Sequence, residues 1–193
     1  MNRRIPTMSS IPTVSSPAIT KWNIDPVHSV AEFRVRHMMI SSVRGQFTGV
    51  TGTLTYDESD LSRSSVEANI DVASVNTHDA QRDAHLKSPD FFDVEKFPAL
   101  SFRSTRVTRK SDGSVAVAGP LTIHGVTREV EFAVEGPTPP MKDPWGNTRI
   151  GVTATTRINR TDFGLNFNAA LETGGVLVGE DVNITLELEF VKA

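Results

Sequence analysis

Two histidines, an arginine and a glutamine have the spacing of one helix face. His78, Arg82 and His85 lie at positions i, i+4 and i+7, and Gln81 lies four residues before His85. Such a face offers several hydrogen-bond donors and a permanent positive charge. It therefore suits a phosphate, a pyrophosphate or a carboxylate. The alternative is a solvated face on which Arg82 pairs with a neighbouring aspartate, Asp79 or Asp83.

No other group of residues nominates a catalytic centre. The sequence has no cysteine and no GxSxG, HExxH, GxGxxG or P-loop pattern. Its five histidines lack the spacing of a metal site, so zinc would have to be held by distant strands. We therefore expect no catalytic residue and no metal site. The histidines are His28, His37, His78, His85 and His124.

Most of the chain alternates apolar and polar residues with a period of two, which predicts strands with one apolar face and one wet face. The clearest strands are 28–37, 65–72, 129–135 and 182–190, and weaker ones are 46–56, 100–108, 115–123, 148–159 and 166–171. Asp112-Gly113, His124-Gly125 and Gly174-Gly175 are typical of hairpin turns. About eight or nine antiparallel strands indicate a closed barrel or a sandwich, and we favour the barrel because closure removes exposed edges.

Residues 78–97 lack this alternation and contain good helix formers. Asn76 or Thr77 can cap a helix here, with Asp79 in its first turn, and Pro89 ends it. We therefore expect an all-β fold with one short helix between two strands.

The first 20 residues are rich in Ser, Thr and Pro, and prolines and serines interrupt any apolar core of a signal peptide. We expect a disordered tail over residues 1–20, a barrel domain over residues 21–193, and a cytoplasmic location. Beyond residue 21 the chain has 17 basic and 23 acidic residues, which argues against nucleic-acid binding. No run approaches ~20 apolar residues, so we expect no membrane span.

Small residues among the inward-facing candidates predict an open bore. A barrel of about eight strands can hold one ligand, and each buried CH₂ of a hydrocarbon contributes ~0.8 kcal/mol. A long-chain lipid therefore suits such a bore. The small residues are Ala31, Gly49, Thr51, Ala68, Gly119, Gly151 and Ala154.

Five motifs follow one another across about 170 residues, from Trp22 to Val191. They are Trp22–Ser29; Gly45–Gly49 with Gly52 and Leu54; Arg82–Leu86 with Asp90–Asp93 and Phe97-Pro98; Gly119–Thr127; and Asn159–Leu165. Together they resemble the YceI-like family of lipid-binding proteins. The resemblance implies an extended, lipocalin-like antiparallel β-barrel with an internal hydrophobic tunnel. It also implies a polyprenyl phosphate, a quinone-type lipid or another long-chain amphiphile as ligand, a homodimer, and no enzymatic activity. Many members carry a secretory signal and work in the periplasm, a feature that this sequence lacks.

We therefore predict non-catalytic binding, storage or transport of a long-chain isoprenoid or other amphiphilic lipid, with no resident cofactor. The predicted head-group residues are His78, Gln81, Arg82 and His85, with His37, Arg157 and Asn159 as further contributors. The predicted tail residues are Phe33, Val35, Phe47, Ile70, Phe102, Leu121, Phe132, Ile158 and Phe167.

Two alternatives remain open. One is an enzyme that acts on a lipid phosphate or ester through His85 with Asp83 or Asp162. The other is a β-barrel interaction module with a filled core.

Overall fold

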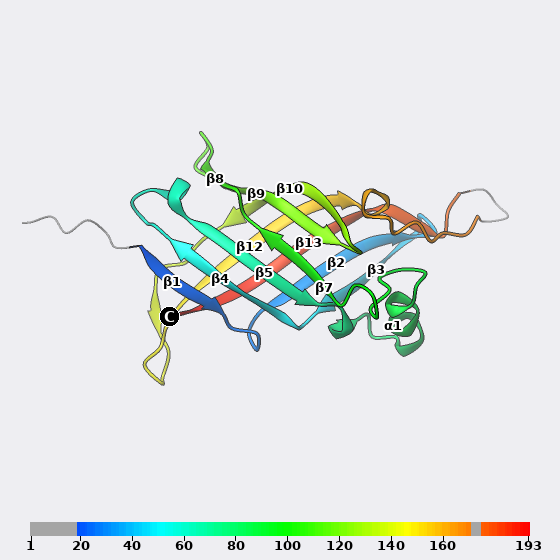
Figure 1. Ribbon diagram of the computed structural model, residues 1–193, viewed down its shortest axis with the longest axis horizontal. Helices are drawn as coiled ribbons and strands as arrows, with labels where there is room; N and C mark the ends of the chain where they lie inside the picture. The colour runs from blue at the N-terminus through cyan, green and yellow to red at the C-terminus, as the bar shows by residue number, and fades with distance from the viewer. Residues whose placement is uncertain (1–18, 171–174) are drawn as a thin grey trace, which may run out of the picture.

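Eight antiparallel strands close a barrel around one interior. The computed structural model describes residues 19–170 and 175–193. The closed ring runs β12-β10-β9-β7-β5-β4-β1-β13 and returns to β12 (Figure 1). Its strands are β1 (Thr20–Ile24), β4 (Val50–Tyr56), β5 (Ser65–Asp71), β7 (Ala99–Arg103), β9 (Val115–Ile123), β10 (Val126–Glu135), β12 (Thr148–Asn159) and β13 (Val178–Lys192).

A branch of three strands extends the barrel wall beyond this ring. The branch consists of β2 (Val30–His37), β3 (Ser41–Phe47) and β6 (Val75–Asn76). Strand β13 is 15 residues long, so it pairs with β1 near its end and with β2 over its first part. Strand β6 pairs with β3 alone, and α1 (Ala80–Lys87) packs beside it.

Short elements complete the wall. Strand β8 (Arg106–Arg109) pairs with β9, and β11 (Met141–Lys142) pairs with β12. Three single-turn 3₁₀ helices, η1 (Leu61–Arg63), η2 (Val72–Ser74) and η3 (Arg160–Phe163), link the strands. Among the described residues, α1 is the one α-helix, and no helix has the length and apolar character needed to cross a membrane.

The two-residue period places the core on the inner face of the sheet. Buried residues come from nearly every strand of the ring, with Trp22 and Ile24 from β1 and Ile150 from β12, and Phe190 from β13 is almost fully buried. Because successive side chains of a strand point to opposite faces, the apolar faces meet inside the barrel. The predicted all-β barrel of about eight strands with one short helix is confirmed.

Several predicted strands need adjustment. Strands 115–123 and 148–159 have the predicted bounds. The stretch 46–56 is instead the end of β3 and all of β4, and 100–108 divides into β7 and β8. Residues 166–170 form no strand, only an isolated bridge between Ala170 and Val176, and Leu171 lies outside the described residues. Of the predicted hairpin glycines, Gly113 and Gly125 have positive φ, as does Gly175, whereas Gly174 lies outside the described residues.

The helix begins later than the sequence predicted. Asp79 is its N-cap, because the Asp79 carboxylate accepts hydrogen bonds from the backbone N–H groups of Gln81 and Arg82 at 3.1 and 3.0 Å. The predicted capping by Asn76 or Thr77 was therefore wrong. Residues 1–18 of the predicted tail lie outside the described residues, and Thr20 already belongs to β1.

Candidate functional site

An apolar cavity of about 700 Å³ occupies the barrel interior. All nine residues predicted to contact a lipid tail line this cavity: Phe33, Val35, Phe47, Ile70, Phe102, Leu121, Phe132, Ile158 and Phe167. The prediction that a lipid tail contacts them stays a prediction.

The inward register explains why these side chains converge. Along β13, Val182, Ile184 and Leu186 line the cavity, whereas the intervening Asn183 and Thr185 do not. Of the small residues singled out in the sequence, Ala31, Ala68 and Ala154 line the cavity, and the other four do not.

Aromatic rings pack along the cavity wall. The rings of Phe33 and Phe47 lie 5.6 Å apart, and those of Phe102 and Phe132 lie 5.1 Å apart in an edge-to-face arrangement. Their neighbours along the wall include the small Ala31 and Ala68. The large rings therefore pack on one another and leave the cavity between the walls.

A polar mouth lies at the end of the barrel where α1 packs. Three of the predicted head-group residues, His37, Arg82 and His85, line the cavity there. The Nε2 atom of His85 lies 2.9 Å from a carboxylate oxygen of Asp90. The His85 ring also meets the ring of Phe91 at 5.1 Å and that of Phe167 at 4.8 Å, both nearly at right angles. His85 is thus held in a fixed orientation between two aromatic rings.

Arg82 is anchored by its own segment. Its Nε atom donates to Oγ1 of Thr77 at 2.8 Å, and its Nη2 atom donates to the Thr77 carbonyl at 2.8 Å. The Thr77 hydroxyl in turn donates to Asp83 at 2.6 Å, and Nη1 of Arg82 lies 4.0 Å from Asp79. This network fixes the position of the Arg82 guanidinium at the mouth and partly neutralises its charge.

The other four predicted head-group residues do not reach the cavity. His78 precedes the helix with φ of 60°, so it does not share a helix face with His85, and Gln81 is exposed. Arg157 pairs with Asp181 on the outer surface, and the Asn159 side chain caps η3 by accepting from the Thr161 N–H.

The strand period accounts for two of these outcomes. Ile158 faces inward, so Arg157 and Asn159 on either side of it in β12 point away from the interior. All three cannot line one cavity.

Arg160 is the mouth residue that the sequence analysis missed. It is only 4% exposed and lines the cavity. Its guanidinium donates to the backbone carbonyls of Gly179 (2.9 Å), Val178 (3.2 Å) and Leu165. Among residues 19–170 and 175–193, Arg160 has no carboxylate within the 4.0 Å of an ion pair. Burial lowers the pKa of its guanidinium. The inward register of Ile158, two residues earlier, would have pointed to it.

The ionisable residues of the cavity wall are mostly cationic. One is an acid, Glu32, and one is a phenol, Tyr56. The six basic side chains are Arg36, His37, Arg82, His85, Arg109 and Arg160. Tyr56 and Arg109 belong to strands β4 and β8, away from α1, and burial raises the pKa of Tyr56. An anionic or neutral polar head group fits this wall better than a cationic one.

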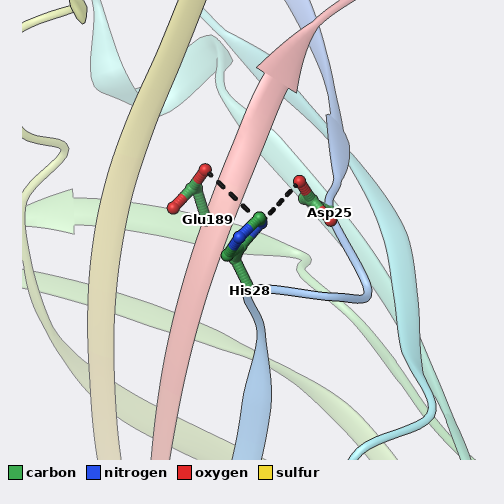
Figure 2. Close-up of side chains that lie close together, drawn as sticks. All are labelled: Asp25, His28 and Glu189. Atoms are coloured by element: carbon green, nitrogen blue, oxygen red, sulfur yellow. Dashed lines mark hydrogen bonds and ion pairs between the residues drawn. The ribbon is translucent and has the colours of Figure 1, made fainter. Parts of the chain in front are cut away.

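A second cluster lies outside the cavity, where β1, β12 and β13 meet. Asp25, His28 and Glu189 bring metal-ligand atoms within 4.8 Å of one another (Figure 2). The Nδ1 atom of His28 lies 3.0 Å from Asp25 and 4.0 Å from Glu189. The guanidinium of Arg149 donates to both of these carboxylates and, at 2.7 Å, to Asp143.

Protein groups already hold the carboxylates of this cluster, with one guanidinium shared among three of them. Hydrogen bonds to His28 and Arg149 hold the pKa of Asp25 well below its usual range. Burial raises the pKa of Asp143, but hydrogen bonds from Arg149 and Asn147 outweigh it and lower the pKa to about 2. We name Asp25, His28, Asp143, Arg149 and Glu189 the carboxylate clasp. Arg149 occupies the position that a metal ion would take between these carboxylates. The cluster therefore links the ends of β1, β12 and β13.

The histidine proposed as a general base has a different partner from the two that the sequence suggested. His85 contacts Asp90, whereas Asp83 accepts from Thr77 and Asp162 lies exposed in η3. The geometry therefore gives no His85–Asp83 or His85–Asp162 pair.

Comparisons with known proteins agree with the fold. A family profile described as the YceI-like domain matches residues 22–190. The UPF0312 protein SA2479 of Staphylococcus aureus is 39% identical over 173 residues, which cover 89% of this chain and 98% of that protein.

Solved structures share the architecture. Burkholderia cenocepacia BcnA is 21% identical with a TM-score of 0.72, over 86% of this chain and 98% of that one. The Campylobacter jejuni YceI protein is 27% identical with a TM-score of 0.68, over 82% and 90%. A polyisoprenoid-binding domain from Saccharophagus degradans, implicated in plant cell wall breakdown, is 15% identical with a TM-score of 0.64, over 91% and 100%. With the family profile spanning nearly the whole barrel and a relative this similar along its full length, the chain belongs to the YceI-like family.

Proposed function

We propose that this protein binds a long-chain amphiphilic lipid, with the chain of the lipid inside the barrel and its head group at the mouth beside α1. The observation that carries the proposal is the apolar cavity of about 700 Å³. Cavities of ~300–1,000 Å³ are the usual size of small-molecule sites. As part of this proposal the protein acts as a binding protein and not as an enzyme.

The physical driving force is burial of hydrocarbon. Each CH₂ transferred from water to the cavity contributes ~0.8 kcal/mol, and ordering of the chain subtracts from the sum. The wall has no polar pattern that would select one chain, so length and flexibility set the affinity. An isoprenoid tail suits this wall, and the description of the Saccharophagus degradans domain as polyisoprenoid-binding supports the same class.

The head group is placed by charge. Arg82, His85 and Arg160 provide donors at the mouth, and Arg160 has no carboxylate partner among the described residues. A phosphate or a quinone-type ring can accept hydrogen bonds from these donors. A polyprenyl phosphate is therefore the ligand that uses both the cavity and its cations.

The test is to block the cavity with one side chain. Ala154 is buried in β12 and lines the cavity, so Ala154→Phe places a ring in the bore. The matched control is Ala133→Phe, because Ala133 is exposed on the neighbouring strand β10. Native mass spectrometry should show polyprenyl phosphate bound to the wild type and to Ala133→Phe, and at least about tenfold weaker binding to Ala154→Phe.

Two results would reject the proposal. One is wild-type protein that takes up no long-chain amphiphile from detergent. The other is a folded Ala154→Phe variant, checked by circular dichroism, that binds as tightly as Ala133→Phe.

Storage or transport, a homodimer and a cytoplasmic location are the finer parts of the proposal. Transport requires that bound lipid leaves for an acceptor vesicle, which a transfer assay measures directly. The mass of the purified protein in solution, measured by light scattering, distinguishes a dimer from a monomer.

A further inference from the structure

An exposed apolar turn joins β2 to β3 at the mouth of the barrel. Met38, Met39 and Ile40 form this turn and are 38, 58 and 78% exposed. Both methionines have positive φ, 50° and 61°. Asn, Asp and Gly are the residues that favour such backbone, so two methionines here are locally unfavourable. Stability of the turn therefore does not explain these side chains. We name residues 38–40 the apolar tip.

The apolar tip adjoins the cavity. The backbone N–H of Met38 donates to the carbonyl of Leu177 at 2.8 Å, and His37 pairs with Val178. His37, Leu177 and Val178 all line the cavity. Figure 1 shows α1 and the residues that follow η3 at this same end of the long axis. A surface that contacts the apolar tip is thus next to the mouth.

The outer face of the same hairpin is basic. Arg34 and Arg44 lie directly opposite each other across β2 and β3, and Arg36, two residues nearer the apolar tip, is exposed and also contributes to the cavity wall. None of the three forms an ion pair within 4.0 Å among residues 19–170 and 175–193. Glu32 and Glu180 are the nearby acids that lack an ion pair in this part of the chain, whereas Asp181 is paired with Arg157. Like charges placed opposite each other are unfavourable without a counter-charge.

The two features have a single complementary partner. An apolar tip a few residues from unpaired arginines matches the interface of a bilayer, with hydrocarbon below and anionic head groups above. We propose that the β2–β3 hairpin docks the barrel mouth on an anionic membrane surface, where a lipid exchanges between bilayer and cavity. This inference rests on the proposed lipid binding, and it adds the surface from which the lipid is taken.

The experiment measures docking and binding separately. Docking is measured by flotation with vesicles of equimolar phosphatidylglycerol and phosphatidylcholine, and with phosphatidylcholine alone. Wild-type protein should float with the anionic vesicles at low salt and be released at high salt, because screening weakens exposed charges. Ile40→Asp, and separately Arg34→Gln with Arg44→Gln, should each weaken vesicle binding about tenfold.

A matched control lies in another exposed turn. Trp145, between β11 and β12, is 81% exposed and apolar, but does not line the cavity. Trp145→Asp should float like the wild type. If Trp145→Asp loses vesicle binding while Ile40→Asp keeps it, or if wild-type protein floats with neither vesicle, the docking inference is overturned.

Binding is measured with polyprenyl phosphate delivered from detergent, which needs no membrane. Ile40→Asp should bind this ligand like the wild type, yet take it up from anionic vesicles about tenfold more slowly. If the wild type does not bind ligand from detergent, the proposed function fails. If Ile40→Asp takes up lipid from vesicles at the wild-type rate, the docking inference alone fails.

Discussion

Arg157 and Arg160 are three residues apart, yet they face opposite environments. Arg157 is exposed and forms an ion pair with Asp181. Arg160 is buried, and its hydrogen-bond acceptors are backbone carbonyls. A buried cation without a carboxylate is costly unless hydrogen bonds satisfy it. Its three carbonyl partners hold the guanidinium beside the cavity, and Glu180 interacts with its charge only from beyond ion-pair distance. Arg160 is therefore the residue best suited to an anionic head group.

Replacing Arg160 should separate charged ligands from neutral ones. Arg160→Met keeps much of the apolar stem but leaves three carbonyls without their donor, so the free energy of unfolding should fall by about 2–3 kcal/mol. Affinity for a polyprenyl phosphate should fall about tenfold more than affinity for the neutral polyprenol, measured by isothermal calorimetry in detergent. Arg157→Met, on the outer face, should change neither affinity. Equal losses for the two ligands would remove Arg160 from the head-group site.

At the scale of elements, the strands were more predictable than the residues that occupy their ends. The period of two was enough for the bounds of β9 and β12 and for the inward placement of eight of the nine tail residues, whereas Phe167 lines the cavity from a segment that forms no strand. It also implied that Arg157 and Asn159 could not face inward with Ile158, a constraint that the predicted head-group set violated.

The start of α1 was not decidable from local pattern. Asn76, Thr77 and Asp79 are all good N-cap residues. Thr77 is instead used in the hydrogen-bond network of Arg82 and Asp83, and Asn76 accepts from the backbone N–H of His78. The choice depends on contacts that form only once the segment packs at the barrel mouth. His78 was misplaced on the helix for the same reason.

The cap of α1 should control how long a ligand stays bound. Asp79→Ala removes the two capping hydrogen bonds and should destabilise the helix by about 1 kcal/mol. Because α1 places Arg82 and His85 at the mouth, amide hydrogens of residues 80–87 should exchange faster and bound lipid should dissociate several-fold faster. Asp112→Ala removes a comparable side-chain contact in the β8–β9 turn and serves as control. Unchanged lipid dissociation in Asp79→Ala would show that α1 does not retain the ligand.

At the scale of the whole molecule, the carboxylate clasp joins segments from both ends of the chain. Asp25 follows β1, Arg149 opens β12, and Glu189 lies near the end of β13. Sequence separations of 124 and 40 residues hide this cluster from any local pattern. The clasp arises only when the barrel closes, which is why the sequence could predict the cavity wall but not this cluster.

The clasp should make stability depend on pH in an acid window. Asp25 and Asp143 have lower pKa values in the folded protein than their ordinary value of 3.8, so they stabilise the fold above about pH 4. That contribution is lost as the pH falls through the folded pKa of Asp143, about 2.

Arg149→Met should reduce this pH dependence. The variant leaves the three carboxylates without their shared cation, so the free energy of unfolding at pH 7 should fall by about 3 kcal/mol. Between pH 4 and 2 the variant should lose less further stability than the wild type, measured by urea unfolding at each pH. Arg106→Met, which removes an exposed guanidinium 4.0 Å from Glu131, should leave the curve unchanged. Parallel curves for Arg149→Met and wild type would contradict the role of the clasp.

Strand β6 has a pairing partner on one side only, and this affects how the barrel can widen. Around the ring, backbone hydrogen bonds join each strand to its neighbours. Widening the barrel there would therefore break the hydrogen bonds between two strands. The segment that links β6 to β7 consists of α1 and residues 88–98, which contact the barrel through side chains such as Phe92 on Phe47 and through a hydrogen bond from the Val72 N–H to the Pro98 carbonyl. If the proposed ligand is thicker than the resting bore, we expect α1 and residues 88–98 to move outward while the hydrogen-bonded ring of strands keeps its shape.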